Sequence, residues 1–244
     1  MKQGAIGILG GMGSIATADF FMRLVRAFPA EKEWDRPRIV VDNACQMPSR
    51  VRAILYGERR EELIDALASG IAGLAAQGCT DVALCCNTSH VFLPEALAKA
   101  RAPSREPHVW HILRLLGEEL RQGGVTRASL IATEGTILSG IYEQTLAEYG
   151  VTVDCEGESA FGELRELIEA VKQDAVDEAA IERFIALVER QPNENVILGC
   201  TEFPILRGAL GKREATLRRR LRDPLDSTIA ALKNEFLGLG AGRV

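Results

Sequence analysis

The sequence has few histidines, and its cysteines follow neither a metal-binding nor a disulfide pattern. Only three histidines occur among 244 residues, and none stands at zinc-ligand spacing from a cysteine. The six cysteines form no Cys-x-x-Cys pair and are few for this length, which argues against a disulfide scaffold. We therefore expect free thiols, no bound metal and a reducing, cytoplasmic location. Four thiols are interpreted as small apolar residues: Cys45, Cys79, Cys85 and Cys155.

Long hydrophobic runs and a strong net charge are also missing. No apolar segment is long enough to span a membrane, and the first residues lead directly into a strand-like segment, so we expect neither a signal peptide nor membrane binding. The net charge of −5 disfavours nucleic acid as a partner. The basic stretch at 207–222 contains no aromatic residue, and we interpret it as a solvated helix face. Its last cations are Lys212, Arg213, Arg218, Arg219, Arg220 and Arg222.

What the sequence does have is a regular alternation of strand and helix patterns. Apolar residues make up 47% of the chain, enough for a sizeable core. Short apolar runs predict strands at 5–9, 38–41, 83–86, 128–132, 151–154 and 196–198. Helical periodicity predicts helices after position 14, over about 61–77, from 94, and over 112–122, 139–149, 162–172, 177–190 and from 224 onward. Strands that alternate with helices form parallel sheets.

The first helix is the best defined by local signals. Gly10-Gly11-Met12-Gly13 turns the chain after the first strand, and Ser14 is expected to cap the helix that follows. Within it, apolar residues recur at helical spacing at Ile15, Ala18, Met22 and Val25.

The chain also contains a weak internal repeat. Residues 6–13 and 130–136 are each a strand followed by a loop of small and polar residues, and each precedes its own cysteine-bearing strand. We expect an α/β fold of two similar, parallel-sheet (flavodoxin-like) domains, with the active site in the cleft between them at the carboxyl ends of the strands. The predicted domains are 1–101 plus about 211–244, which carries Cys86, and about 102–210, which carries Cys200.

Two cysteines stand at the ends of strand-like runs. Cys86 follows Ala83-Leu84-Cys85, and Cys200 follows Val196-Ile197-Leu198-Gly199. Such strand ends bring side chains to the edge of a sheet, so we expect both thiols to face one cavity. A thiol pair can remove a hydrogen from a carbon beside a carboxylate and return one on the opposite face. Buried, inert cysteines are the plainer interpretation, but polar residues follow both: Asn87, Thr88, Thr201 and Glu202.

Two other chemistries fit parts of the sequence. Gly11-x-Gly13-x-x-Ala16, with Asp42 at the end of the next strand, fits a dinucleotide-binding loop, but that interpretation leaves the cysteine pair without a role. The same loop can hold a carboxylate with its backbone amides, which we favour. A cysteine hydrolase would need a histidine beside Cys86. The candidates are His90, His108 and His111, although such histidines are more often surface or core residues.

Three motifs together resemble a known group. They are Ile6-Gly7-Ile8-Leu9-Gly10-Gly11-Met12-Gly13, Cys86-Asn87-Thr88-Ser89-His90 and Gly199-Cys200-Thr201-Glu202. They resemble the signatures of the aspartate/glutamate racemase superfamily, on its aspartate racemase side. Ser139-Gly140-Ile141-Tyr142 also resembles that family. The resemblance spans nearly the whole chain and implies a racemase without a cofactor, two pseudo-symmetric α/β domains and a homodimer.

The resemblance also implies roles for individual residues. Cys86 and Cys200 are expected to be the catalytic acid/base pair. Arg50 resembles the arginine that holds the substrate's side-chain carboxylate, and Lys172 a second cationic contact; the alternative for both is a surface cation. The other expected substrate-binding residues are Met12, Gly13, Asn87, Thr88, Thr133, Thr201 and Glu202. Asn87, Thr88 and Thr201 are expected to bind the substrate's α-carboxylate or its amine. Glu202 is expected to tune Cys200 or to hold the substrate's ammonium group.

Two positions depart from the family pattern. Ser14 stands where proline is usual, and Ser89, where alanine is usual, is expected to alter pocket polarity and substrate choice. Because both cysteines are present, we predict two-base racemisation of an acidic amino acid, aspartate or glutamate or both. Two alternatives stay open: a related cysteine-dependent decarboxylase or isomerase of a small carboxylic acid, and a non-catalytic sensor of an acidic metabolite with oxidant-responsive thiols.

Overall fold

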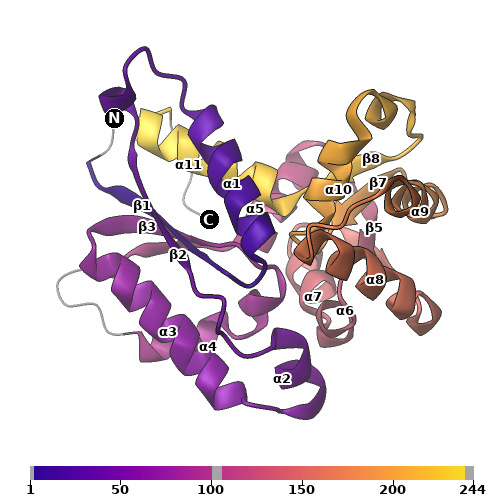
Figure 1. Cartoon of the computed structure of the whole chain (residues 1–244), viewed down its shortest axis with the longest axis horizontal. Helices are drawn as coiled ribbons and strands as arrows, with labels where there is room; N and C mark the ends of the chain where they lie inside the picture. The colour runs from indigo at the N-terminus through magenta and orange to yellow at the C-terminus, as the bar shows by residue number, and fades with distance from the viewer. Residues whose placement is uncertain (1–2, 101–105, 240–244) are drawn as a thin grey trace.

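The computed structural model of the chain describes residues 3–100 and 106–239. Within these ranges, two parallel sheets of four strands each lie side by side (Figure 1). The first sheet contains β1 (Ala5–Gly10), β2 (Arg38–Asn43), β3 (Cys79–Leu84) and β4 (His108–Trp110). The second contains β5 (Arg127–Ile131), β6 (Thr152–Cys155), β7 (Asn195–Leu198) and β8 (Arg220–Arg222). We call the two sheets with their helices the first half and the second half.

The two sheets share one topology. Their strand orders are β2-β1-β3-β4 and β6-β5-β7-β8, with parallel pairing throughout. The predicted α/β class, with two similar parallel-sheet halves, is thereby confirmed. In each sheet, successive strands are added first toward one edge and then toward the other. The reversal lies between β1 and β3 in the first sheet and between β5 and β7 in the second. Ligands bind beyond the carboxyl ends of strands at such a reversal, and the segments that carry Cys86 and Cys200 emerge there.

Helices cover both faces of the first sheet (Figure 1). The first half has α1 (Ser14–Ala27), α2 (Arg50–Tyr56), α3 (Arg60–Ala76), α4 (Leu93–Lys99) and α5 (Ile112–Gln122). The second half has α6 (Glu134–Ser139), α7 (Ile141–Ala147), α8 (Phe161–Lys172), α9 (Glu178–Glu189) and α10 (Phe203–Leu210), and α11 (Pro224–Leu237) follows. Helices α3 and α4 lie on one face of the sheet, and α1 and α11 on the other. Contacts of α2 with α6, and of α1 with α8, join the halves beside the cleft.

Burial on both faces explains why the strands are continuous apolar runs. All six residues of β1 are buried. Ile6 and Ile8 belong to a core that continues into the second half, where it includes Leu130. Leu9, on the opposite face, belongs to a separate core with Leu63 of α3. The shared core fixes the two halves relative to each other.

The predicted domain boundaries place two short strands in the wrong sheet. Residues 108–110 were expected in the second domain, but as β4 they pair with β3. Residues 220–222 were expected in the first domain, but as β8 they pair with β7. The predicted boundary at 101/102 lies outside the described residues. We keep the two-domain division as a proposal, with the chain crossing to the second half after α5 and returning after β8.

Two predictions about the first helix are wrong. Ser14 is the first helical residue rather than its cap, because Gly13 takes the cap position. The Ser14 hydroxyl instead accepts a hydrogen bond of 3.1 Å from the Asn43 amide. Ile15 and Met22 are exposed, and the buried face of α1 is formed by Ala16, Thr17, Phe20 and Leu24. Apolar residues occur on both faces of this helix, so periodicity alone did not select the inner one.

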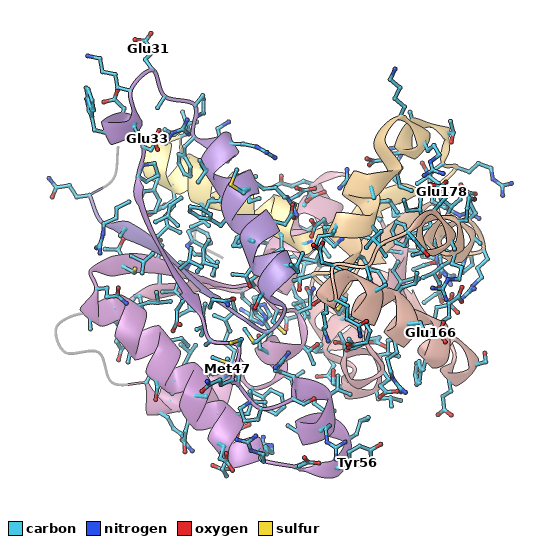
Figure 2. The ribbon with its side chains drawn as sticks, in the orientation of Figure 1. Glu31, Glu33, Met47, Tyr56, Glu166 and Glu178 are labelled. Carbon is cyan, nitrogen blue, oxygen red and sulfur yellow. The ribbon has the colours of Figure 1, made fainter. Side chains whose placement is uncertain are left out.

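Two other local predictions also need correction. The helix expected at 139–149 is the shorter α7, and a second short helix that was not expected, α6, precedes it from Glu134; Gly140, with a φ of +67°, separates the two. The basic stretch is not a helix face: it contains a 3₁₀ helix, Gly211–Thr216, and strand β8. Its arginines pair with glutamates, for example Arg213 with Glu178, which Figure 2 shows at the outer surface of the second half.

No helix among the described residues is long and apolar enough to cross a membrane.

Candidate active site

A small cavity lies between the loops at the carboxyl ends of the two sheets. Its volume is about 70 Å³, room for a few water molecules or a small ligand. It is lined by Met12, Ser49, Arg50, Val51, Cys86, Asn87, Thr88, Thr133, Ile168, Lys172, Cys200, Thr201 and Glu202. Every predicted site residue except Gly13 is in this lining. The site residues come together because each follows a central strand or flanks the cleft on α2 or α8.

The two predicted thiols occupy equivalent positions in the two halves. Cys86 lies two residues beyond the end of β3, and Cys200 lies two residues beyond the end of β7. The residue between strand and thiol is bonded alike in both halves: the Cys85 amide donates to the Leu9 carbonyl at 2.9 Å, and the Gly199 amide donates to the Ile131 carbonyl at 2.8 Å. Each thiol residue keeps 8% of its surface exposed. The structure therefore places both cysteines at the wall of one cavity.

Glu202 contacts Cys200 directly. The Cys200 thiol donates to Oε2 of Glu202 over 2.9 Å, and the Thr201 hydroxyl donates to the same oxygen over 3.3 Å. Burial raises the pKa of the Cys200 thiol well above its usual range, and the charge and hydrogen bond of Glu202 raise it further. Cys200 is thus held as a thiol.

Gly13 lies against Glu202 and is not part of the cavity lining. A Cβ atom at position 13 would lie 2.2 Å from Oε1 of Glu202, so only glycine leaves room for this carboxylate. Oε1 is buried and has no hydrogen-bond partner within residues 3–100 and 106–239. The site therefore holds a buried acceptor that no described protein group satisfies.

Asn87 supplies the complementary donor. The Tyr142 hydroxyl, on α7, donates to Oδ1 of Asn87 over 2.8 Å, and both residues are buried. The Nδ2 group of Asn87 is also buried, and the part of the chain that the structure describes offers it no partner. Asn87 lines the cavity, so a buried donor without a partner among the described residues belongs to a residue of its wall.

Threonine hydroxyls connect the two halves beside Asn87. Thr88 of the first half lies 2.7 Å from the Thr136 hydroxyl of α6, and Thr133 lies 2.9 Å from Thr136. Thr133 is also the N-cap of α6, where it accepts a hydrogen bond from the Thr136 amide. Thr88 and Thr133 thus line the cavity in fixed orientations.

Arg50 is held by backbone carbonyls rather than by a carboxylate. Its Nη2 group donates to the Met12 carbonyl at 2.8 Å, and Nη1 donates to the Pro48 carbonyl at 3.0 Å. These bonds orient the guanidinium without neutralising its charge. A half-buried cation at the cavity wall suits an anionic ligand.

Lys172 stands at the end of α8, with 37% of its side chain exposed, and donates to Glu169 at 2.9 Å. Desolvation by itself lowers the pKa of Lys172, but the hydrogen bond to Glu169 and the negative charges of Glu202 and Glu169 outweigh it, so this pKa is raised. The ammonium group therefore stays charged at the cavity mouth.

His90 has a backbone role. The amide of Ile112 can only donate, so Nε2 of His90 accepts from it at 3.4 Å, and Nδ1 carries the proton that is donated to the Cys86 carbonyl at 3.0 Å. Burial lowers the pKa of His90 to about 4. Both ring nitrogens are occupied, which argues against a hydrolase with His90 as base. His108 and His111 are absent from the cavity lining.

The expectation that Ser89 alters pocket polarity is wrong. Ser89 is fully buried and does not line the cavity. Its hydroxyl donates to the Cys86 carbonyl at 2.8 Å. Ser89 and His90 together fix the backbone that carries the Cys86 thiol.

The glycine-rich loop does not resemble a dinucleotide site in this setting. The amide of Gly11 donates to the Thr17 hydroxyl at 2.9 Å and is not available to a phosphate. The Glu202 carboxylate fills the space next to Gly13, where a second anion would be repelled. The cavity is also far smaller than the several hundred cubic ångströms that larger ligands need.

The remaining cysteines differ from one another. Cys79 and Cys85 are buried as predicted, and burial raises the pKa of Cys85 well above its usual range. Cys155 is half-buried and donates to Glu143, and Cys45 is exposed, contrary to its interpretation as an apolar core residue.

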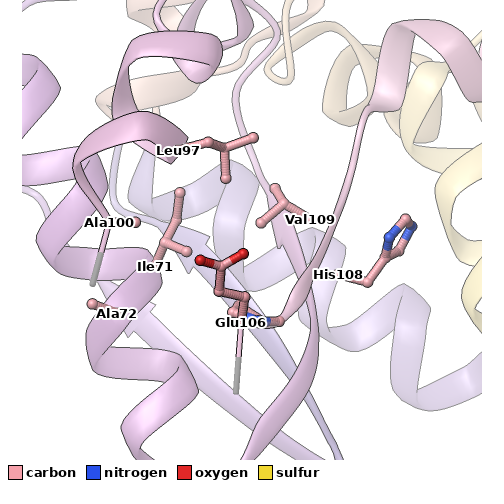
Figure 3. A pocket seen from close by; sticks show the side chains of 8 residues that line it. Ile71, Ala72, Leu97, Ala100, Glu106, His108 and Val109 are labelled. Carbon is pink, nitrogen blue, oxygen red and sulfur yellow. The ribbon is translucent and has the colours of Figure 1, made fainter. Parts of the chain in front are cut away.

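A larger cavity elsewhere has no comparable chemistry. About 280 Å³ lies near the start of β4, at the opposite edge of the first sheet from Cys86. Figure 3 shows Glu106 between Ile71 and Val109 in this cavity. Its lining contains no thiol and no buried cation.

Several residues of the site were missed from the sequence. Ser49 and Val51 flank Arg50 in the lining. Ile168 precedes Lys172 by one helical turn, so helical spacing could have suggested Ile168 as a site residue. Tyr142 and Thr136 lie outside the lining but hold Asn87 and Thr88. Tyr142 belongs to a motif noticed in the sequence, but no local pattern indicated its partner.

Known proteins share both the sequence pattern and the fold. A family model described as Asp/Glu/Hydantoin racemase matches residues 9–232. A glutamate racemase of Paracoccus denitrificans (strain Pd 1222) is 27% identical over 210 residues, 78% of this chain and 75% of that protein. The broad specificity amino-acid racemase RacX of Bacillus subtilis (strain 168) is 29% identical over 153 residues, 61% of this chain and 63% of that protein. The solved Picrophilus torridus aspartate racemase is similar with a TM-score of 0.78 and 25% identity, over 96% of this chain and 95% of that one.

Proposed function

Because the chain belongs to the Asp/Glu/hydantoin racemase family, we propose that it interconverts the enantiomers of an acidic amino acid without a cofactor. The observation that carries the proposal is that Cys86 and Cys200 line one small cavity, from opposite halves of the molecule. Inversion at a carbon requires a base on one face and an acid on the other, and a pair of thiols brought to one cavity by the two halves suits that requirement.

We assign the resting proton of the pair to Cys200. The buried thiol beside Glu202 is held protonated, so we assign Cys200 as the acid and Cys86 as the base for one direction of the reaction. Cys86 takes the proton from Cα, and Cys200 delivers its own proton to the opposite face. One C–H bond breaks, one forms, and the thiols exchange protonation states. Reaction of the other enantiomer runs in the reverse direction.

Charge in the cavity suits a substrate with two carboxylates. Two cationic side chains, Arg50 and Lys172, and one anionic side chain, Glu202, are in the lining. The two cations suit the carboxylate groups of an acidic amino acid, and Glu202 suits its ammonium group. We propose that Arg50 and Lys172 hold the side-chain carboxylate, and that Arg50 contributes the planar, multi-donor contact.

The two unsatisfied polar groups suit the head of an amino acid. Asn87 offers a donor, which fits the α-carboxylate, and Glu202 offers an acceptor, which fits the ammonium group. A simple dicarboxylic acid would leave the Glu202 oxygen unsatisfied in a buried site. This pairing favours an amino-acid substrate over the alternative of a decarboxylase or isomerase acting on a small carboxylic acid.

Proton exchange in D2O tests the proposal. L- and D-aspartate and L- and D-glutamate are incubated separately with the protein and no added cofactor. We expect loss of the Cα proton signal by NMR and appearance of the opposite enantiomer on a chiral column. Binding without exchange would instead support the sensor alternative. The homodimer and the cytoplasmic location stay predictions, the first of which sedimentation can check.

Cysteine variants test the two-base mechanism. Cys86→Ala and Cys200→Ala are each expected to abolish racemisation, since each removes one of the two proton-transfer groups. Cys45→Ala is the matched control, because Cys45 is exposed and absent from the cavity lining. Full racemisation by either single variant would rule out the mechanism.

A further inference from the structure

We infer that Tyr142 is a positioning residue for the proposed racemisation: its hydroxyl fixes the side-chain amide of Asn87 so that the NH2 group faces the substrate's α-carboxylate. The inference rests on the proposed function. Tyr142 lies on α7 in the second half and is not in the cavity lining. Asn87 follows Cys86 in the first half and does line the cavity. Tyr142 therefore acts through Asn87 and not on the substrate.

The first step is the orientation of the amide. An asparagine side chain has a donor end and an acceptor end, and a half-turn exchanges them. The Tyr142 hydroxyl donates to the acceptor end over 2.8 Å. A fully buried phenol needs such a partner. Burial also raises the pKa of Tyr142 well above its usual range, so the phenol keeps its proton and remains a donor.

The second step is what this orientation leaves for the ligand. With Oδ1 bound to the phenol, Nδ2 is the end of Asn87 that lacks a partner among the described residues. The reversed amide would present a carbonyl oxygen, which repels a carboxylate. Tyr142 thus converts Asn87 from a group that can donate or accept into a dedicated donor.

The third step separates this role from simple anchoring. The loop after Cys86 is also tied to the second half by the 2.7 Å contact between Thr88 and Thr136. Loss of the Tyr142 hydroxyl leaves that contact in place, and a phenylalanine ring keeps the packing of the tyrosine ring. The main effect of Tyr142→Phe should therefore be on the amide of Asn87.

A double-mutant cycle tests the inference. Tyr142→Phe, Asn87→Ala and the double variant are compared with the wild type by kcat/KM for the preferred acidic amino acid. We expect a loss of about tenfold for Tyr142→Phe, the size of one hydrogen bond. The double variant should match Asn87→Ala within about twofold, because Tyr142 has no effect once the amide is absent. Tyr149→Phe is the control, since its ring lies against Gly117 of α5 and its activity should be unchanged.

A second readout distinguishes positioning from stability. Inhibition constants are measured for a substrate analogue with an α-carboxylate and for its α-carboxamide. We expect the wild type to favour the carboxylate and Tyr142→Phe to lose most of that preference, because its amide can rotate to accept from the carboxamide. Melting temperatures of the variants show whether stability accounts for lost activity.

The outcomes separate the two proposals. If the wild type is active, any one of three results would overturn the role of Tyr142 and leave the proposed function intact. They are full activity of Tyr142→Phe, losses that multiply in the double variant, and an unchanged preference for the carboxylate. Absence of turnover in the wild type with all four acidic amino acids would overturn the proposed function and, with it, this inference.

Discussion

The thiol of Cys200 donates a hydrogen bond to Oε2 of Glu202 across 2.9 Å. The other oxygen of this carboxylate lies where a side chain at position 13 would be. The loop after the first strand of one half therefore packs on the cysteine edge of the other half. Since a neighbouring carboxylate disfavours ionisation of a thiol, this contact sets the protonation state of one member of the proposed catalytic pair.

Glu202→Gln should make Cys200 more reactive while lowering racemisation. Removal of the negative charge takes away a cause of the raised pKa of Cys200, so more thiolate is present at a given pH. We expect alkylation of Cys200 by iodoacetamide to speed up at pH 8, as followed by peptide mass spectrometry. We also expect kcat/KM to fall at least tenfold, because the proposed ammonium contact weakens. An unchanged alkylation rate would contradict this account of Cys200.

Gly13→Ala should inactivate the protein without unfolding it. The added Cβ would lie 2.2 Å from Oε1 of Glu202, so the carboxylate has to move away from Cys200. We expect kcat/KM to fall about a hundredfold, with a far-UV circular dichroism spectrum like that of the wild type. Gly162→Ala is the matched control, because a Cβ there meets nothing within 4 Å. That change, at the start of α8, should leave activity intact and stabilise the protein by at most about 1 kcal/mol.

Arg50→Lys should weaken binding of the acidic substrate. A lysine keeps the charge but lacks the planar fork that bonds the Met12 and Pro48 carbonyls and leaves further donors for a carboxylate. We expect KM to rise about tenfold or more, with a smaller change in kcat. Arg52→Lys, two residues along on α2 and paired with Glu58 at the surface, should leave both constants unchanged. Equal effects of the two variants would show that Arg50 is an ordinary surface cation.

His90 should make stability depend on pH. Its pKa is lowered to about 4 in the folded protein, whereas it is near 6.5 in the unfolded chain. Below pH 6.5 the unfolded state takes up a proton that the native imidazole does not, so this residue costs the native state ~1.4 kcal/mol per pH unit down to about pH 4.

A variant pair isolates that contribution. His90→Gln should be less stable than the wild type at pH 7 in urea unfolding, and the difference should shrink as the pH falls from about 6.5 to 4. Ser89→Ala removes the other bond to the Cys86 carbonyl but no titrating group. Its deficit in the free energy of unfolding should stay constant over the same range. Parallel pH profiles of all three proteins would contradict the buried, neutral state of His90.

The sequence by itself determined the architecture and the positions of the two thiols at the ends of their strands. Strands buried on both faces are continuous apolar runs, so the central strands and the repeat were visible without coordinates. Because parallel strands gather their carboxyl ends at one edge, the cysteine that follows each central strand of the repeat had to reach the cleft. The positions of Cys86 and Cys200 follow from that rule, and the structure places both there.

The tertiary structure alone decided the contacts that join the halves. Tyr142 and Asn87 are 55 positions apart, and no periodicity links a phenol on one element to an amide on another. The space that Gly13 leaves for Glu202 is likewise a property of two packed halves. Strands β4 and β8, three residues each, are too short to form an apolar run, and pairing with a longer neighbour is what makes them strands. Local pattern specifies elements and their ends, whereas long-range packing specifies which polar atoms meet.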